Sequence, residues 1–381
     1  MKQLQKSFSG PVEEAEPKRR RSLVRGFCQC AADWVATTGQ GEVRLIVPAT
    51  HVQCRPLLAG GGSKLDVFSS YIAAGAHVAL LPNARCIGNE GAVVTSDGHL
   101  LISTIHRFPK PVSASAAWEH RVNPGEELEF DGVLGVMVHH GTCSFAHVLA
   151  DGLPRIWLVR EAVNEPDAWI VPAHLPSWFS ELLDMVGIPA KRQLRVESNS
   201  TVRARCLVVP DGTGFALSVA PWARTALVDL LGLTDDHPDG HRRIWISREL
   251  AGRRRWLQEG EARSALEKRG FLICQFDGQP IDWQLKLALG SDVIAGPHGA
   301  GLSWGLVARQ PRGLLFEVAD SILVHNDYRA VAAVVGWDYA RTSHANVPVS
   351  EGDNFLCDLD IGLGEVIETL DLALDRWINQ V

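Results

Sequence analysis

Short hydrophobic runs recur along the chain, and many of them stop at a proline or a glycine. Val47, Leu81, Val171 and Val209, for example, are each followed directly by proline. Apolar runs of this length are typical of parallel strands that are covered on both faces. They predict strands at 43–47, 76–81, 133–138, 168–171, 206–209, 244–246, 271–276, 293–295 and 314–318.

Stretches with helical periodicity lie between these runs. They predict helices at 144–161, 175–186, 220–231, 259–269, 282–289 and 364–381. Strands that alternate with helices favour an α/β fold with parallel sheets. The alternation is clearest from about residue 165 to 340, whereas 40–140 is less regular and rich in turn residues.

The length of 381 residues favours two domains. We expect a flexible basic tail at 1–25, an N-terminal α/β domain at 26–200, a C-terminal Rossmann-like domain at 201–350, and a last helical segment at 351–381 that packs back on the N-terminal domain. The tail contains the basic run Lys18–Arg21. It is interpreted as solvated, with peripheral contact to an anionic membrane surface as the alternative.

Composition excludes several classes of protein. Hydrophobic residues make up 46% and charged residues 21%, which is a globular balance. The net charge of −7 argues against a general nucleic-acid binder, although small phosphorylated ligands remain open. The eight cysteines contain no Cys-x-x-Cys pair, so buried reduced thiols are expected. No secretory signal or membrane span is predicted, and we therefore expect a cytoplasmic protein, with the inner membrane face as a further possibility.

His147 and Asp151 are the first candidate site residues. They are four residues apart in a stretch with helical periodicity, so they share one face of the helix. A carboxylate beside an imidazole can act as a general base or orient one. Pro154 lacks a backbone donor, and the helix should end or bend there. The alternative is a polar pair on the surface of a helix N-terminus.

A basic segment follows the strand predicted at 244–246. Ser247 and Arg248 end this strand, and Arg253–Arg255 follow. Ligands of open α/β sheets bind at the carboxyl ends of the strands, and the guanidinium group matches phosphate oxygens. The segment therefore predicts an anion site, with a solvated basic loop as the alternative.

A glycine-rich turn follows the strand predicted at 293–295. It runs from Gly296 to Gly301 and contains His298. Glycines let a backbone approach a phosphate closely, and a helix N-terminus offers free N–H groups. No Gly-Lys-Ser/Thr follows, so this is not a P-loop. A purely structural turn is the alternative.

The same segment contains a rival motif. Residues 301–305 fit the Gly-x-Ser-x-Gly pattern of α/β-hydrolases, with Ser303 as the nucleophile. Asp320, Asp327 or Asp338 with His325 or His344 would complete the catalytic set. The predicted strand ends well before Gly301, however, whereas the nucleophile should follow its strand at once.

Three blocks in this order resemble glycosyltransferase family 61, which includes bacterial capsular polysaccharide-type proteins. The first block comprises Phe145, His147, Asp151 and Leu153–Arg155; the second comprises Ser247–Arg248, Arg254–Arg255, Gln258–Glu259 and Gly270–Phe271; the third comprises Gln284, the strand at 293–295, His298–Leu302 and Glu317. The resemblance covers about residues 130–320.

The resemblance implies a GT-B architecture, in which two Rossmann-like domains with parallel sheets face each other across a cleft. It implies an inverting hexosyl- or pentosyltransferase that uses a nucleotide diphosphate donor, usually a UDP-sugar, and a glycan or polysaccharide acceptor. The N-terminal domain would take the acceptor and the C-terminal domain the donor. No metal and no cofactor are expected. Asp358 and Asp360 resemble metal–nucleotide aspartates, but they lie near the end of the chain. His139–His140 have no third ligand at a recognisable spacing.

Carried onto this sequence, the resemblance implies Asp151 as the catalytic base, with His147 orienting or replacing it. Glu317 would hold a ribose hydroxyl or have a structural role. The implied donor-binding residues are Arg155, Arg248, Arg254, Arg255, Glu259, His298, Gly299, Ala300, Gly301 and Glu317.

The chain departs from the family pattern at two positions. Trp304 and Gln258 stand where the family often has asparagine. Trp304 would either pack in a helix or reshape the donor pocket. Two other functions stay open. One is a serine hydrolase that uses Ser303, and the other is a nucleotide-sugar-binding protein without catalytic activity.

Overall fold

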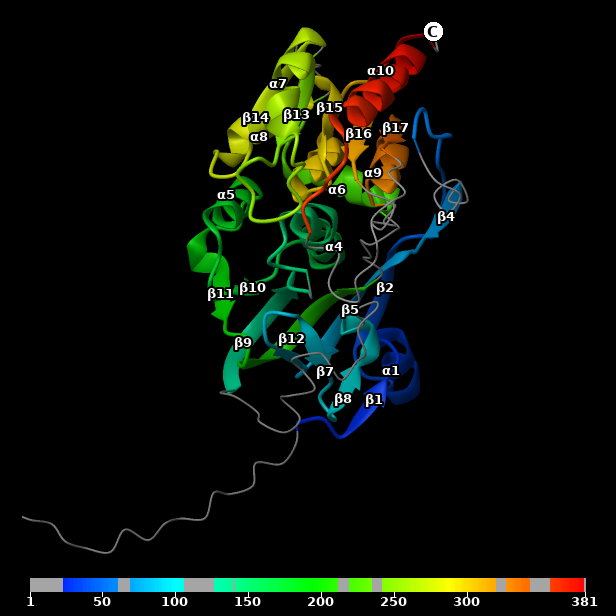
Figure 1. Cartoon of the computed structure of the whole chain (residues 1–381). Coiled ribbons are helices and arrows are strands. Elements are labelled where there is room, and N and C mark those ends of the chain that lie inside the picture. Colours follow the sequence, from blue (N-terminus) through cyan, green and yellow to red (C-terminus); the bar gives the residue numbers. More distant parts are fainter. Residues whose placement is uncertain are drawn as a thin grey trace, which may run out of the picture.

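The computed structural model describes residues 23–60, 69–105, 127–139, 141–211, 219–234, 242–319, 327–342 and 357–379. The two larger sheets of the described residues lie at opposite ends of the molecule, with helices packed between them (Figure 1). All strands and helices predicted from the hydrophobic pattern are present, and the predicted α/β class is confirmed. The basic run at 18–21 lies outside the described residues.

The N-terminal sheet has ten strands among the described residues, with β12 near its middle. β12 pairs in parallel with β9 but antiparallel with β5 and β6. Its strands are β1 (Gly26–Cys28), β2 (Glu42–Val47), β5 (Ala76–Pro82), β6 (Arg85–Ile87), β7 (Ala92–Val94), β8 (His99–Leu101), β9 (Glu127–Val136), β10 (Ala168–Pro172), β11 (Gln193–Val196) and β12 (Thr201–Asp211).

This sheet differs from the parallel sheet that the resemblance implied for the N-terminal half. It is mixed because β6, β7 and β8 follow one another through short turns, and only antiparallel neighbours can be joined that tightly. β12 begins at Thr201, directly after the boundary that the sequence predicted at residue 200. Its pairing nevertheless places it in the N-terminal sheet.

The C-terminal sheet is parallel throughout its five described strands. In spatial order these are β14 (Phe271–Gln275), β13 (Arg242–Ser247), β15 (Ser291–Pro297), β16 (Leu314–Val318) and β17 (Asp338–Arg341). Counted along the chain, this order is 2-1-3-4-5. The direction of strand addition therefore reverses between β13 and β15, and such a switch point opens a crevice at the carboxyl ends of the strands.

Alternate residues of these strands face two different hydrophobic clusters. Trp245 and Phe316 pack with α7 (Glu259–Lys268) and α10 (Leu363–Asn379). Ile244 and Leu315 point the other way, toward α8 (Ile281–Leu289), the 3₁₀ segment η5 (Ala300–Val307) and α9 (Asp327–Val335). The apolar runs are continuous because both faces of the sheet are covered.

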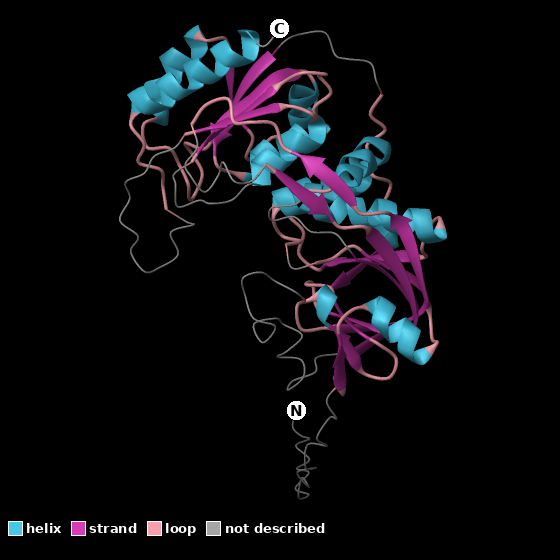
Figure 2. Cartoon of the chain, turned by 90° about the vertical axis from the view of Figure 1, so that its right-hand side faces the viewer, coloured by secondary structure: helices cyan, strands magenta, loops and turns pink. Residues whose placement is uncertain are grey.

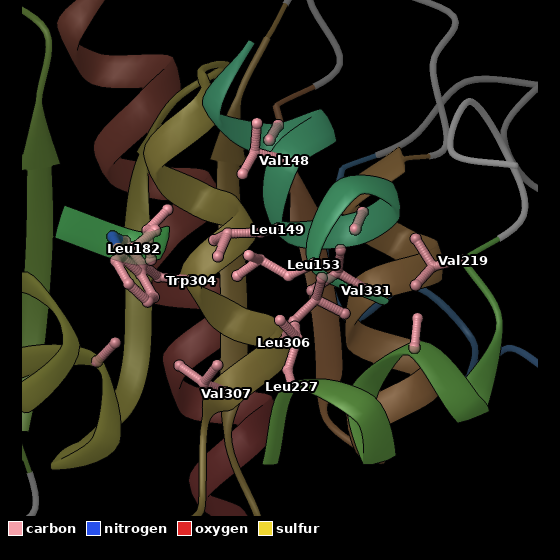
Figure 3. Close-up of a cluster of buried hydrophobic side chains, with 14 of the residues drawn as sticks. Val148, Leu149, Leu153, Leu182, Val219, Leu227, Trp304, Leu306, Val307 and Val331 are labelled. Carbon is pink, nitrogen blue, oxygen red and sulfur yellow. The ribbon is translucent and has the colours of Figure 1, made fainter. Parts of the chain in front are cut away.

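One large hydrophobic core joins the two halves of the molecule. Leu149 and Leu153, Leu227 of α6 (Pro221–Leu230), Leu306 of η5 and Val331 of α9 come together in it (Figure 3). Val208 of β12 and Ile294 of β15 belong to the same cluster, so both sheets contribute to it. Burial of each such side chain contributes about 1.5–3 kcal/mol of transfer free energy.

A segment of the N-terminal half also meets the C-terminal sheet, whose outer face is covered by helices (Figure 2). Leu57 forms a bridge with Tyr339 of β17, and Leu58 packs in the cluster beneath α10. Arg376 of α10 donates to the Leu58 carbonyl, and α10 itself packs against α7, β16 and β17. The last helix thus packs on the C-terminal sheet, and its link to the N-terminal half runs through the segment around Leu58.

The remaining described elements lie at the edges. α1 (Ala31–Thr38) packs Trp34 on the outer face of the N-terminal sheet. α5 (Ser177–Met185) is part of the connection from β10 to β11, and β3 (Thr50–Gln53) pairs with β4 (Ser70–Ala73). In the described part of the chain, no helix is both long and apolar enough to span a bilayer. All eight cysteines lie in described segments and carry free thiols.

Candidate active site

The first group of candidate residues lies on a helical stretch with an irregular turn. It consists of α3 (Phe145–His147), a π-helical turn at Val148–Gly152 and α4 (Leu153–Val163). Pro154 has no N–H to donate to the carbonyl four residues earlier, so regular α-helical bonding fails just before it. Turns of this kind are frequent at functional sites, and this one contains Asp151.

His147 and Asp151 form a hydrogen-bonded pair. The distance from His147 Nδ1 to Asp151 Oδ2 is 3.2 Å. The Asp151 side chain is 5% exposed and that of His147 is 25% exposed. An ionised carboxylate only accepts, so Nδ1 of the neutral imidazole carries the proton and Nε2 carries the lone pair. Oδ1 of Asp151 is buried and has no hydrogen-bond partner among the described residues.

His139 and Arg155 flank this pair. His139 is buried in the loop after β9, and its ring centroid lies 6.1 Å from that of His147. Arg155 donates through Nη1 to the Pro210 carbonyl at 3.2 Å. Burial lowers the pKa of Arg155, and the charge of Asp151 opposes that shift. Arg155 thus faces the end of β12, and it balances the charge of Asp151 from the side of the N-terminal sheet.

Arg248 lies at the carboxyl end of β13, beside the switch point. Its backbone N–H donates to the Glu259 carboxylate at 3.1 Å, and the Trp245 indole donates to the same group at 2.8 Å. Burial raises the pKa of Glu259, and these hydrogen bonds oppose the shift. Glu259 is therefore buried beneath the loop, where it holds the backbone that carries Arg248.

The Arg248 guanidinium lies against the glycine turn. A Cβ atom on Gly299 would come within 2.4 Å of Arg248 Nη1. Arg248 also donates to the carbonyls of Arg254 at 3.2 Å and Arg253 at 2.8 Å, which fixes its direction. Burial lowers the pKa of Arg248, but an arginine remains charged at neutral pH. A partly buried cation thus adjoins the backbone that begins η5 at Ala300.

His298 and Glu317 form a second, fully buried pair. Nδ1 of His298 contacts Oε1 of Glu317, and the Tyr339 hydroxyl donates to Oε2. Burial raises the pKa of Glu317, but the charges of His298 and Arg341 and the two hydrogen bonds outweigh it and lower the pKa below its ordinary value. Glu317 therefore orients the imidazole of His298 and is itself fully enclosed.

The other two arginines of the basic segment have different surroundings. Burial lowers the pKa of Arg254, and the charge of Arg248 adds to this effect. Arg255 instead binds Asp358 through its backbone N–H at 2.9 Å and through Nε at 3.0 Å. Asp360 accepts from the Gln258 amide at 3.2 Å. Arg255 and both aspartates thus tie the segment before α10 to the loop after β13.

A pocket of about 150 Å³ opens at the switch point. Ser247, Arg248 and residues 299–302 form one wall, from the C-terminal half. Phe145, Trp178 and Glu181 line it from the N-terminal half, and a third group after β14 completes it: Phe276, Asp277, Gly278, Gln279, Ile281 and Gln284. Cation, glycine backbone, aromatic rings and polar side chains therefore converge in one cavity, as ligand pockets generally require.

Trp304 packs behind this pocket. It is fully buried, its indole donates to Gln284 Oε1 at 3.0 Å, and its ring lies 5.3 Å from that of Phe145. Phe145 and Gln284 both line the pocket. Trp304 therefore packs in the core, as one interpretation held, and from behind it also supports two residues that line the pocket.

Ser303 has no elbow geometry. It lies inside η5 and is fully buried, and its hydroxyl donates to the Ala300 carbonyl at 2.6 Å. The nucleophile of a hydrolase must be presented at a sharp turn after a strand. Of the other proposed members, Asp320, His325 and His344 lie outside the described residues, Asp327 begins α9, and Asp338 pairs with Arg55.

The sequence-predicted residues thus fall into three sets. Arg248 and residues 299–301 line the pocket. The helical stretch that carries His147 and Asp151 packs against η5, and Phe145 of the same stretch reaches the pocket. His147 and Asp151 themselves do not line the pocket. The remaining predicted residues do not line it either: Arg155, Arg254, Arg255, Glu259, His298 and Glu317.

Several site residues were not found from the sequence. Tyr328 of α9 is buried, donates to the Gly299 carbonyl at 2.5 Å and lies edge-on to His298. Trp178 and Glu181 reach the pocket from α5, and Asp277 reaches it from the turn after β14. Only Asp277 had a usable signal, because it follows the carboxyl end of a predicted strand.

Within the described part of the chain, no group of three His, Cys, Asp or Glu side chains is placed to hold a metal ion. His140 lies outside the described residues. The charges that could face an anion in the pocket come instead from arginine, as Arg248 lines it and Arg254 adjoins Arg248.

Comparison with known proteins supports the resemblance seen in the sequence. The family model described as Glycosyltransferase 61 matches residues 145–315. The match starts at Phe145 and ends within β16, so it contains the His147–Asp151 pair, the Arg248 loop and the glycine turn. It suggests glycosyltransferase activity. No curated protein matches the chain.

Proposed function

We propose that the protein is a metal-independent, inverting glycosyltransferase. It moves a sugar from a nucleotide diphosphate donor, a UDP-sugar in the first instance, to a hydroxyl group of a glycan or polysaccharide such as a capsule. One observation carries the proposal: the Arg248 guanidinium is held against the Gly299 backbone in the pocket at the switch point of a parallel sheet. The family match over residues 145–315 supports the same activity.

The donor diphosphate would bind between Arg248 and the glycine turn. Negative charge develops on the diphosphate as its bond to the sugar breaks, and a fixed cation in a water-poor site stabilises it without reorganisation. Arg254 adds a second charge next to Arg248. His298 is buried, is oriented by Glu317 and adjoins Gly299, so it would help to position the glycine turn from behind.

The His147–Asp151 pair would activate the acceptor. With Nδ1–H donated to Asp151, Nε2 of His147 is the atom that takes the proton of the attacking hydroxyl. The acceptor oxygen then forms the bond to the anomeric carbon, and the diphosphate leaves from the opposite face with the bonding electrons. Asp151 stabilises the imidazolium, while the greater exposure of His147 gives a substrate access to it. We thus assign proton transfer to His147 and orientation to Asp151.

The GT-B arrangement belongs to this proposal. The pocket is lined by α3 and α5 from the half that contains the N-terminal sheet, and by the strand ends of the C-terminal sheet. A donor held on the C-terminal side and an acceptor approaching over the His147–Asp151 pair would then meet between the two sheets.

The first test is thermal melting with UDP, GDP and their sugar conjugates, with and without EDTA. A ligand that binds the folded state raises stability by about 2.7 kcal/mol at 100 times its dissociation constant. We expect a rise in Tm with UDP that survives EDTA. No shift with any nucleotide, or a shift that EDTA removes, would contradict the metal-independent donor site.

The second test separates catalysis from binding. His147→Gln and Asp151→Asn should lower kcat for sugar transfer by about 10²–10⁴-fold, the usual range for loss of a general base, and leave the Kd for UDP unchanged. A protein that binds UDP-sugars but never transfers or hydrolyses them, before any substitution, would instead be a non-catalytic binding protein. Undiminished activity in both variants would exclude the pair as the base.

A further inference from the structure

The pocket holds one carboxylate whose role is not explained by packing. Glu317 and Glu259 are buried, and each has its oxygens occupied by neighbouring donors. Neither lines the pocket. Glu181 does, but its Oε2 accepts from the Ile281 backbone N–H at 2.8 Å. Asp277 also lines the pocket, is exposed, and has as its hydrogen bond among the described residues a long 3.5 Å contact from Gln275.

The position of Asp277 on the sheet edge is informative. It follows β14, the strand that pairs with β13 on the side away from β15. The carboxyl edge therefore presents Asp277, then Arg248, then Gly299 in spatial order. Neighbouring strands lie roughly 4.8 Å apart, so Asp277 and the glycine turn are separated by about two strand spacings, with Arg248 between them.

The charges along this edge differ from one end to the other. The charges of Arg248 and Asp277 attract each other within the pocket. A diphosphate is attracted by Arg248 and by the N–H groups of the glycine turn, but it is repelled by the charge of Asp277. A neutral group rich in hydroxyl donors is favoured beside Asp277, because an ionised carboxylate offers two acceptor oxygens and no donor.

In a nucleoside diphosphate, the neutral group next to the phosphates is the ribose. Its adjacent 2′- and 3′-hydroxyls match the two oxygens of one carboxylate. In dinucleotide-binding folds, ligands bind at the carboxyl ends of the parallel strands, and an acidic residue hydrogen-bonds a ribose hydroxyl there. We propose that Asp277 binds the 2′- and 3′-hydroxyls of the donor ribose, and that the site thereby selects ribonucleotides.

This proposal rests on the donor site of the proposed function. The sequence left Glu317 either a ribose hydroxyl or a structural role, and its side chain is enclosed by His298 and Tyr339. We therefore place the ribose at the end of β14, on the side of the switch point opposite to β16. The nucleoside then points toward Phe276 and Gln279 rather than toward α9.

The test compares UDP with 2′-deoxy-UDP and 3′-deoxy-UDP by isothermal titration of the full chain. A hydrogen bond to a charged group contributes enough that each deoxynucleotide should bind the unaltered protein about tenfold or more weakly. In Asp277→Ala, the affinity for UDP should fall by about the product of the two factors, because both hydrogen bonds are lost. All three ligands should then bind within roughly twofold of one another.

A matched variant controls for charge and folding. Asp282→Ala removes an exposed aspartate of α8 that pairs with Lys286 outside the pocket. It should keep the full preference for UDP. The Tm of Asp277→Ala without ligand should equal that of the unaltered protein, because Asp277 is exposed.

The outcomes are distinct. If UDP, GDP and their sugar conjugates all fail to bind the unaltered protein, the donor site itself is wrong. If UDP and both deoxynucleotides bind equally, or if Asp277→Ala keeps the preference, the donor site stands and the role of Asp277 is overturned. Loss of affinity in Asp277→Ala for a UDP-sugar but not for UDP would also overturn it, because Asp277 would then bind the transferred sugar.

Discussion

At the scale of single residues, the donor side depends on a close approach between one arginine and one glycine. Gly299 has an extended backbone, with φ of −173°, so its conformation is open to any residue. Glycine is needed at this position because it has no side chain, and Arg248 fills the space that a Cβ would take. Gly296, in contrast, is needed inside β15, where a Cβ would lie 2.5 Å from the Ile246 carbonyl oxygen of β13.

Gly299→Ala should displace Arg248 without unfolding the protein. The new methyl group would meet Nη1 at 2.4 Å and Cδ at 2.8 Å, and a flexible side chain yields more easily than backbone does. We expect the Kd for UDP to rise about tenfold, the equivalent of one charged hydrogen bond, with little change in Tm. Titration calorimetry measures the first quantity and a melting curve the second.

Gly252→Ala is the control for this substitution. Gly252 lies in the same loop as Arg248, and a Cβ there would have no heavy atom within 4 Å. Its Kd for UDP should be unchanged. Equal affinities for the two variants would mean that the position of Arg248 does not set donor binding.

At the scale of elements, irregular helical segments position the functional residues. The π turn before Pro154 carries Asp151, and η5 carries the glycine wall of the pocket. Short turns also fix the far edge of the N-terminal sheet. Asp97, between β7 and β8, accepts from the Trp34 indole of α1 at 3.0 Å and thereby ties the helix to the hairpin.

Asp97 should make this edge sensitive to acid. Burial raises the pKa of Asp97, but hydrogen bonds from Thr95, His99 and Trp34 outweigh it and lower the pKa to about 2. A carboxyl group with a lowered pKa contributes stability above the pKa of the unfolded chain, roughly 3.9, and loses it as pH falls toward 2.

The variant Asp97→Asn tests this pH dependence. At pH 7 it should be less stable by about 1 kcal/mol, the value of a typical net hydrogen bond at a partly exposed site. The difference should shrink between pH 4 and pH 2, as measured by urea unfolding with circular dichroism. Asp375→Asn, an exposed position on α10, should show no such trend. A constant difference across this window would contradict the low pKa.

At the scale of the whole molecule, the two sheets are joined rather than merely adjacent. The core between them takes side chains from α4, α6, η5 and α9 (Figure 3), and β12 and β15 contribute to the same cluster. Leu58, from the N-terminal half, is part of the cluster under α10. A core shared in this way couples the stability of the two halves.

The protein should therefore unfold in a single cooperative transition. Leu306→Ala, at a fully buried position of η5, should cost about 2–5 kcal/mol and move the whole calorimetric transition down. Leu250→Ala, at a position that is 79% exposed, should leave it unchanged. Two separate transitions, or a shift in only part of the heat absorption, would show that the halves unfold independently.

Much of the C-terminal half could be predicted from the sequence. The run 314–318 is apolar except for Glu317 and follows Gly313, so pattern alone located β16 at its observed bounds. The short strands β6, β7 and β8 were missed, because three residues give too little periodicity to detect. The mixed pairing of their sheet followed from turns that the apolar runs do not encode.

The candidate site was predictable only where chemistry and position coincide along the chain. Spacing alone paired His147 with Asp151, and strand ends indicated Arg248 and the glycine turn. The sequence also proposed Arg255 as a donor ligand, but its charge is used by Asp358 more than 100 residues later. Such partners are set by long-range packing, which local pattern does not contain.

The sequence by itself determined the α/β class, the strand–helix alternation from about residue 165 onward and the paired His147–Asp151 motif, because each depends on local periodicity. Only the tertiary structure decided which carboxylates are enclosed and which is open. Glu317 and Glu259 are buried by neighbours that are distant in sequence, while Asp277 is left facing Arg248. Burial is a property of how elements pack together, and it therefore appears only once the chain has folded.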